Sequence, residues 1–242
     1  KKGIEFTLGY NGRVSDFRYS VSGNIAYNTN EVKKYKGQLE EGYITDANGN
    51  QVYSSNLGSV STGTSQRILE GHGINEYYLY PIYRGTGAYT NTDGSVNIHG
   101  GPKDGMIRTE QDMKWLQMMQ AAGYNFQPSG DVSKSKIWYG DLIYADTNGD
   151  GIYGNTYDQK FTGKRATPSI NYGFNMNLAY KGFDMSMIWA GSAGMSYYWS
   201  ELYMNLSTVG LGKAVPTMIA DNHYYYNEAN ASDPANNING HY

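Results

Sequence analysis

The sequence predicts an all-β fold of long antiparallel strands, of the kind that belongs to a transmembrane β-barrel with long external loops. Three observations carry this prediction: the composition, a two-residue alternation of apolar and polar side chains in two hairpins, and a strong asymmetry in the lengths of the connections. One short helix, over residues 110–122, is the only helix expected.

The composition excludes several classes of protein. The 242 residues include 31 Gly, 25 Tyr and 23 Asn, a blend too aromatic for a disordered chain and too poor in helix formers for a helical bundle. No run approaches 18 apolar residues, which excludes a membrane-spanning helix. The net charge of −3 offers no basic surface for nucleic acid, and zero Cys excludes disulfides and Cys-based zinc sites.

Two hairpins are predicted from side chains that alternate with a period of two. The first covers residues 3–28 around a turn at 11–16, and the second covers residues 171–189 around a turn at 181–182. Each run has about the length that a tilted strand needs to cross a bilayer, and the apolar faces end in Tyr or Trp, as membrane interfaces favour. The alternative is an antiparallel sheet of a soluble sandwich, wet on one face.

The parity of the alternation assigns side chains to the two faces of the predicted barrel wall. The face expected to meet lipid carries Phe6, Leu8, Phe17, Tyr19, Val21, Phe174, Met176, Met185 and Met187. The face expected to meet the lumen carries Glu5, Arg18, Asn24, Asn175 and Asn177. An Arg on the lipid face at mid-bilayer would cost roughly 2–4 kcal/mol, so this parity is strongly specified.

The connections divide the chain into unequal parts. Residues 30–136 form a long external loop region, 137–190 hold strands, and 191–242 form another external loop, whereas the two turns are very short. The helix at 110–122 has Thr109 as its N-cap and Asp112 in a capping-box position, and its Met and Trp side chains are expected to pack on the base of the loop. We expect the chain to be an interior stretch of a longer polypeptide.

A candidate metal site follows the segment Leu142 to Tyr144, which is expected to be a strand. Oxygen-bearing side chains alternate in Asp146-Thr147-Asn148-Gly149-Asp150-Gly151, as in the front half of a calcium loop. The predicted calcium ligands are Asp146, Asn148, Asp150, the carbonyl of Ile152 and, one residue later than the usual closing position, Asp158. The alternative is an Asx-rich turn that needs no metal.

Enzyme motifs are missing from the sequence. The four His lack metal-ligand spacing, and neither a dinucleotide-binding loop nor a nucleophile elbow is present, so no catalytic residue is assigned and an enzyme is not expected. Aromatic clusters at 77–78, 197–199 and 224–226 could stack on sugars or grip peptides, or could equally pack among the loops. No substrate-binding residue can be assigned.

Several blocks in this order resemble the C-terminal part of the barrel of SusC/RagA-type TonB-linked outer-membrane transporters. The blocks are Gly3-Ile4-Glu5-Phe6 with Leu8, Asp16-Phe17-Arg18-Tyr19, Gly23 to Asn28, Gly140 to Tyr144 leading into Asp146 to Gly151, Pro168 before Tyr172-Gly173, and Tyr180 to Asp184. They cover residues 3 to about 191; the carboxylate at Asp158, the longer loop at 71–105 and the residues after Trp199 depart from the pattern.

The resemblance implies a 22-stranded TonB-dependent barrel in the bacterial outer membrane, to which this chain contributes roughly six strands and several capture loops. It also implies import of an oligosaccharide or peptide together with a SusD-like surface lipoprotein, powered through TonB by parts outside these residues. The competing hypothesis is a secreted β-sandwich adhesin or carbohydrate-binding module with a calcium-pinned loop. A β-rich hydrolase ranks far behind.

Overall fold

The computed structural model describes residues 1–127, 136–197 and 215–241. The chain divides into two compact units: the first comprises Lys1–Glu40, Asn56–Tyr78 and Phe161–Tyr198, and the second Glu41–Ser55, Leu79–Lys160 and Trp199–Tyr242. Most regular structure is antiparallel strand, so the all-β prediction is confirmed. None of the described helices is long and apolar enough to cross a membrane.

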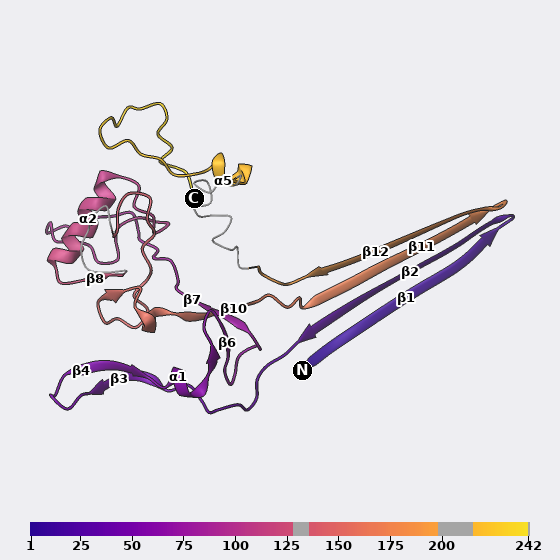
Figure 1. Ribbon diagram of the computed structural model, residues 1–242, viewed down its shortest axis with the longest axis horizontal. Helices are drawn as coiled ribbons and strands as arrows, with labels where there is room; N and C mark the ends of the chain where they lie inside the picture. The colour runs from indigo at the N-terminus through magenta and orange to yellow at the C-terminus, as the bar shows by residue number, and fades with distance from the viewer. Residues whose placement is uncertain (128–135, 198–214, 242) are drawn as a thin grey trace. The chain divides into compact units, whose positions relative to one another are not determined.

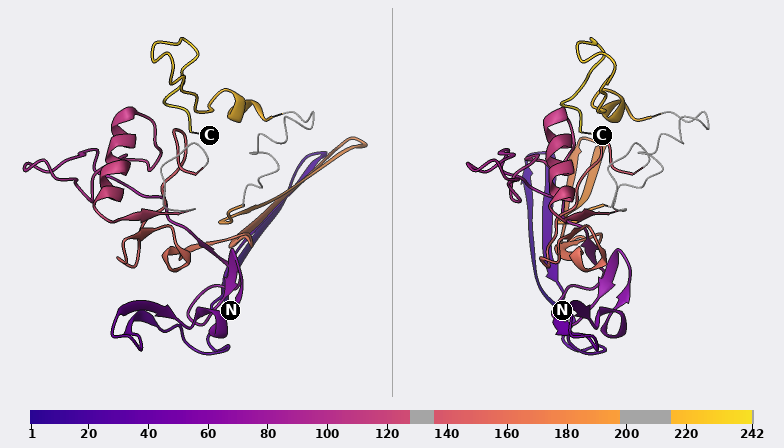
Figure 2. Two further views of the ribbon diagram at one scale, coloured as in Figure 1. Left: turned by 60° about the vertical axis from the view of Figure 1, so that its left-hand side comes forward. Right: turned by 90° about the vertical axis from the view of Figure 1, so that its left-hand side faces the viewer.

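Long strands dominate the first unit (Figure 1). They are β1 (Lys2–Val14), β2 (Phe17–Thr29), β11 (Ile170–Tyr180) and β12 (Phe183–Ala193). They form one antiparallel sheet in the order β1-β2-β11-β12, and they stay side by side in both views of Figure 2. In the described part of the chain this sheet is open, with β1 and β12 at its edges.

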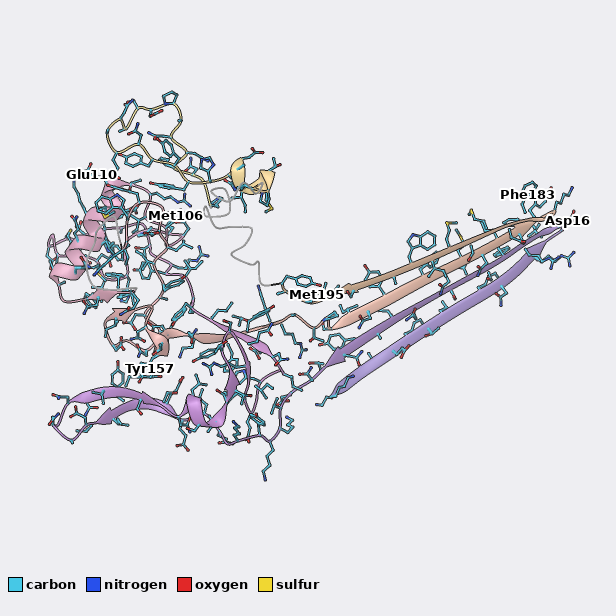
Figure 3. The ribbon with its side chains drawn as sticks, viewed as in Figure 1. Asp16, Met106, Glu110, Tyr157, Phe183 and Met195 are labelled. Atoms are coloured by element: carbon cyan, nitrogen blue, oxygen red, sulfur yellow. The ribbon has the colours of Figure 1, made fainter. Side chains whose placement is uncertain are left out.

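Both short turns lie at the same end of this sheet. Strands β1 and β2 are joined by Ser15-Asp16 alone, so β1 runs further than the sequence suggested and the expected turn at 11–16 is too long. Lys181 and Gly182, with φ of 45° and 88°, join β11 to β12 as a two-residue turn requires. The labelled Asp16 and Phe183 mark this end in Figure 3, and Lys181 Nζ lies 3.9 Å from Asp16 Oδ2.

The strand register places the apolar side chains of all four strands on one face. In β2 and β11, Tyr27 pairs with Ile170, Val21 with Met176 and Phe17 with Tyr180. The flanking strands continue the rows, because Tyr27 pairs with Ile4 and Met176 with Met187. Polar side chains pair across the strands on the opposite face, as Ser20 does with Asn177 and Ser22 with Asn175.

A second, smaller sheet has the strand order β10-β7-β6-β5. Its strands are β5 (Thr62–Gly63), β6 (Gln66–Ile68), β7 (Glu76–Leu79) and β10 (Lys160–Arg165), and the one-turn helix α1 (Leu57–Val60) precedes them. Glu76, the first residue of β7, is buried. Its carboxylate accepts the backbone N–H of Gly163 at 2.6 Å and of Gly73 at 3.2 Å. Residues 30–136 therefore contain much regular structure where the sequence predicted a loop region with one helix.

The second unit has its own apolar core. Its elements are the hairpin β3 (Glu41–Thr45) and β4 (Gln51–Ser55), helix α2 (Glu110–Ala121), the parallel pair β8 (Asn125–Phe126) and β9 (Ile152–Tyr153), the 3₁₀ turn η1 (Thr156–Asp158) and the short helix α5 (Thr217–Ala220). The core consists of Tyr83, Ile107, Met113, Trp115, Leu116, Met119, Phe126, Ile137, Ile143 and Tyr153. The Met and Trp side chains of α2 thus serve packing.

Helix α2 begins where the sequence predicts. The hydroxyl of Thr109 accepts the N–H of Asp112, and the Asp112 carboxylate accepts the N–H of Thr109, which completes the capping box. The expected strand at Leu142 to Tyr144 does not form; Leu142 and Tyr144 make only isolated bridges, to Met106 and Ile82.

Candidate functional site

The predicted calcium loop is closely hydrogen-bonded to its own backbone. Asp146 Oδ1 accepts the N–H of Gly149 at 2.6 Å, and Asp146 Oδ2 accepts the N–H of Gly151 at 2.9 Å. Both glycines have positive φ, 76° and 80°, which L side chains rarely adopt. The loop therefore curls around the Asp146 carboxylate.

Asn148 and Asp150 continue this curl. Asn148 Oδ1 accepts the N–H of Asp150 at 3.2 Å, and Asp150 Oδ1 accepts the N–H of Ile152 at 2.8 Å, where β9 begins. Asp150 Oδ2 accepts the amide groups of Asn148 at 3.1 Å and Asn155 at 2.7 Å. The two side chains thus hold the chain as it enters the strand.

Asp158 has a separate role in the same loop. Its side chain is fully buried, and its Oδ1 accepts the N–H of Thr147 at 2.6 Å and the Thr147 hydroxyl at 3.3 Å. Its Oδ2 accepts the N–H groups of Gly154 at 2.8 Å and Asn155 at 3.0 Å. Burial raises the pKa of Asp158, while the three backbone N–H groups act in the opposite direction. Four donors match the lone-pair sites of one carboxylate, so Asp158 joins the two ends of the loop.

The predicted ligands lie in one loop. Within residues 1–127, 136–197 and 215–241, no group of three or more His, Cys, Asp or Glu side chains is placed to hold a metal ion. Backbone and amide N–H groups hold the carboxylate oxygens instead. Bound calcium stays a prediction.

Hairpin β3–β4 contacts this loop, and no local pattern in the sequence predicts the contact. The Tyr43 hydroxyl donates to the carbonyl of Asn148 at 3.2 Å. The ring of Tyr53 lies 5.1 Å from that of Tyr157, and Lys160 Nζ lies 3.4 Å from Glu41. These contacts join segments about a hundred residues apart, beyond the reach of any local pattern.

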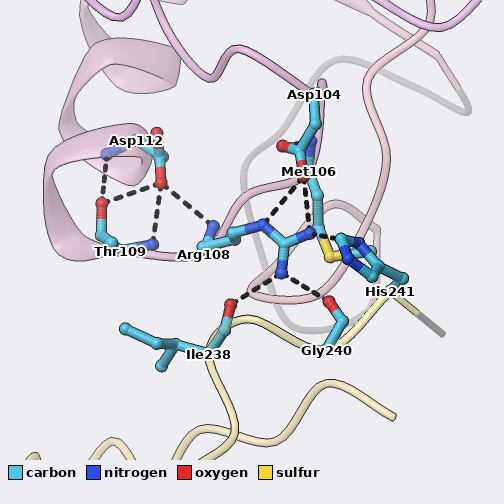
Figure 4. Close-up of polar contacts among 8 residues, drawn as sticks. All are labelled: Asp104, Met106, Arg108, Thr109, Asp112, Ile238, Gly240 and His241. Carbon is cyan, nitrogen blue, oxygen red and sulfur yellow. Dashed lines mark hydrogen bonds and ion pairs between the residues drawn. The ribbon is translucent and has the colours of Figure 1, made fainter. Parts of the chain in front are cut away.

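Arg108 is a second residue whose importance only the structure reveals (Figure 4). Its guanidinium donates to the carbonyls of Ile238 at 2.6 Å and Gly240 at 2.5 Å, and to Asp104 Oδ2 at 2.6 Å. The Tyr224 hydroxyl donates in return to the Arg108 carbonyl at 2.9 Å. Arg108 thereby fastens the segment 222–241 beside the start of α2.

The aromatic clusters mostly serve packing. Tyr77 and Tyr78 belong to β7 and are buried, so they are not the loop residues that a sugar platform would need. Tyr226 packs on Tyr139 with ring centroids 5.2 Å apart. Tyr197 is exposed, whereas its neighbours at 198 and 199 lie outside the described residues.

The long sheet has an apolar face that is exposed within its own unit. No residue of β1, β2, β11 or β12 is buried, and large apolar side chains are highly exposed, such as Ile4 at 73 %, Leu8 at 66 % and Phe183 at 81 %. The nine side chains predicted to face lipid share this face, and the five predicted to face the lumen share the other. Ile188, 76 % exposed, is an apolar exception on the polar face.

Tyrosines mark both ends of the apolar face. Tyr27 and Tyr172 lie toward the end where the long connections leave, and Tyr19 and Tyr180 lie toward the short turns. The rings of Tyr19 and Tyr172 lie across Gly12 and Gly191 of the neighbouring strands, where any Cβ would collide with the ring. Glycine is therefore required at these two positions for the tyrosines to lie flat on the sheet.

Comparison with described protein families and with curated proteins finds no match for this chain.

Proposed function

We propose that this chain forms part of the wall of an outer-membrane β-barrel that imports nutrients, of the SusC/RagA TonB-dependent type. The observation that carries the proposal is the apolar face of the long sheet, whose four strands contain no buried residue. A contiguous apolar surface larger than a few hundred Å² is rare on soluble monomers and marks contact with a partner or a membrane. Lipid tails would cover all of this face.

The spacing of the tyrosines supports a bilayer as the covering medium. Eight residues separate Tyr172 from Tyr180, and Tyr19 from Tyr27. At about 3.3 Å per residue this is about 26 Å along the strand, or about 20 Å across the membrane at a tilt of about 40°. The apolar band of outer-membrane barrels is about 25 Å tall between its aromatic girdles. Phe6, Leu8 and Met176 lie between the tyrosines, where apolar side chains are needed.

The opposite face suits a water-filled lumen. Asn177 donates to Ser20 at 3.2 Å and accepts from Ser186 at 2.7 Å, and Asn175 donates to Ser22 at 3.4 Å. The open edges at β1 and β12 leave backbone groups that only further strands can pair in a bilayer. Closure by other strands of a 22-stranded barrel would satisfy them.

The lengths of the connections support an orientation of the sheet in which the long segments face outward. Short turns of outer-membrane barrels face the periplasm and long loops face outward. Segments 30–136 and 191–242 would then lie outside, where a SusD-like lipoprotein closes over the captured oligosaccharide or peptide. TonB would supply energy through a plug domain.

A structural calcium ion in the Asp146 loop completes the proposal. Each oxygen of Asp146 accepts one backbone N–H and keeps lone-pair capacity for a cation. Asp146, Asn148, Asp150 and the carbonyl of Ile152 offer hard oxygens on a flexible loop, which suits calcium better than magnesium. Asp158 closes the loop through its four hydrogen bonds. The role of the ion would be to brace the loop.

The experiment that tests the proposal compares two substitutions on neighbouring positions of β11. Met176 lies midway between Tyr172 and Tyr180 on the apolar face, and Asn175 lies on the polar face. In full-length protein, Met176→Arg should destabilise the barrel by roughly 2–4 kcal/mol and reduce its folded, heat-modifiable form in outer-membrane fractions. Asn175→Arg should leave assembly near the wild-type level.

Two outcomes would contradict the proposal. Equal tolerance of both substitutions would mean that neither face meets lipid. Recovery of the wild-type protein in the culture fluid would favour the secreted adhesin or carbohydrate-binding module.

A further inference from the structure

Lysines gather where the long sheet meets its long connections. Residues 1–2 and 31–36 contain five Lys and a single acid, Glu31, in a chain whose net charge is −3. All five lysines are exposed. The net charge of these two segments is therefore positive, whereas the net charge of the whole chain is negative.

Lys1, Lys2 and Lys33 lie together at one end of the sheet, and Lys34 and Lys36 follow within three residues of Lys33. Lys2 opens β1 and pairs with Thr29, the last residue of β2. A hollow of about 160 Å³ beside this pair is lined by Lys1, Lys2, Thr29, Asn30, Glu31 and Lys33. Lys2 shares the parity of Ile4 and Phe6, so its side chain leaves the sheet on the apolar face, just beyond the apolar band.

The charges around the hollow are only partly neutralised. Lys33 Nζ lies 2.6 Å from Glu31, and this hydrogen bond lowers the pKa of the Glu31 carboxyl; desolvation opposes the shift, and the nearby charge of Lys2 adds to it. Lys36 lies over the ring of Tyr35, with Nζ 5.6 Å from its centroid. Arg165 adds a further cation near Thr29, with its Nη2 3.3 Å from the Thr29 hydroxyl. Glu70 is a second acid here, since its Oε1 accepts the N–H of Tyr35 at 2.6 Å, but two carboxylates do not balance five lysines and Arg165.

We propose that Lys2, Lys33, Lys34 and Lys36 bind the phosphate groups of anionic lipid headgroups in the membrane leaflet around the long-connection end of the sheet. The inference rests on the proposed function, since it requires the apolar face to lie in a bilayer. Tyr27 and Tyr172 then mark the interface, and Lys2 reaches past them along the apolar surface to the headgroups, as long basic side chains do at membrane boundaries. Clustered lysines attract anionic headgroups as point charges, each contributing about fivefold to the binding constant.

The test uses the full-length protein purified from outer membranes in a neutral detergent. Binding of fluorescent phosphatidylglycerol is compared with that of fluorescent phosphatidylcholine. In the test variant Lys2, Lys33, Lys34 and Lys36 are replaced by Gln; in the control Lys103, Lys114, Lys136 and Lys164 are replaced by Gln. The control removes the same charge from exposed positions elsewhere.

The wild type and the control should bind phosphatidylglycerol at least about tenfold more tightly than the test variant, with weak, equal binding of phosphatidylcholine. Equal affinity of all three proteins for phosphatidylglycerol would overturn the inference. Displacement of the lipid by millimolar inorganic phosphate would also overturn it, because the site would then bind free phosphate. If the wild-type protein is not recovered from outer membranes, the proposed function itself fails; if it is recovered there but the three proteins bind alike, only the lipid site fails.

Discussion

At the scale of single residues, two charged side chains hold segments that lie far apart in the chain. The buried carboxylate of Asp158 accepts hydrogen bonds from residues 147 and 154–155. The guanidinium of Arg108 donates hydrogen bonds to the backbone carbonyls of Ile238 and Gly240. Each side chain makes several hydrogen bonds to backbone groups that have no partner within a helix or a sheet. Their loss should therefore affect stability more than their number suggests.

Asp158→Asn should lower the free energy of unfolding by about 1–3 kcal/mol, because an amide cannot accept all four donors and leaves buried N–H groups unpaired. Asp93→Asn is the control, since Asp93 is an exposed acceptor for Ser95 and should change stability by less than about 0.5 kcal/mol. Denaturant unfolding followed by tryptophan fluorescence measures both. Equal effects would show that Asp158 does not hold the loop.

A calcium titration distinguishes the role of Asp146, a proposed calcium ligand, from that of Asp158, which closes the loop by hydrogen bonds. Added calcium should raise the unfolding temperature of the wild type and of Asp158→Asn, but not that of the double variant Asp146→Asn with Asp150→Asn. Differential scanning fluorimetry with calcium and with a chelator measures this. An unchanged wild-type temperature would leave the loop as an Asx-rich turn.

Acid should weaken the Arg108 contacts. Burial raises the pKa of Asp104, but the Arg108 guanidinium and the N–H of Met106 outweigh it and hold the pKa below its usual value. A lowered folded pKa means that this stabilisation is present above the unfolded value of about 4 and is lost as the pH falls through the folded value. The protection factors of the amides in 222–241, which are corrected for the slower intrinsic exchange in acid, should thus fall below about pH 4 in the wild type. In Arg108→Met they should already be low at pH 6 and change less with acid.

At the scale of elements, α2 depends on its first turn and on its buried side. Thr109 caps the helix, and Met113, Trp115, Leu116 and Met119 are buried beneath it. Thr109→Ala should lower the free energy of unfolding by about 1 kcal/mol, whereas Thr109→Ser keeps the acceptor and should stay near wild type. Helical circular dichroism during denaturant unfolding measures both. A similar loss for Ser would mean that the threonine methyl, and not the cap, matters.

At the scale of the whole molecule, the proposed topology makes the two ends of the sheet chemically distinct in cells. The chain has no Cys, so single cysteines can be introduced without background from these residues. Asn48→Cys, in the β3–β4 turn, and Ser232→Cys should react with an impermeant maleimide on intact cells, while Ser15→Cys should react only after lysis. Labelling of Ser15→Cys alone on intact cells would invert the topology.

Features that depend on near neighbours could be predicted from the sequence. A side-chain period of two sorts Phe6, Val21 and Met176 to one face regardless of which strands pair. Lys181-Gly182 specifies a tight turn through its backbone conformations, and Thr109 with Asp112 specifies the start of α2. All of these need information from only a few residues on either side.

Contacts between distant segments could not be predicted from the sequence and became visible only in the fold. Nothing local in β2 indicates that Tyr27 pairs with Ile170, that Tyr43 donates to Asn148, or that Arg108 holds the carbonyl of Ile238. The same holds for Asp158, whose spacing suggested a calcium ligand but whose lone pairs face backbone N–H groups. A side chain's partners depend on which segments fold together, and loop closure over a hundred residues leaves no periodic trace in the sequence.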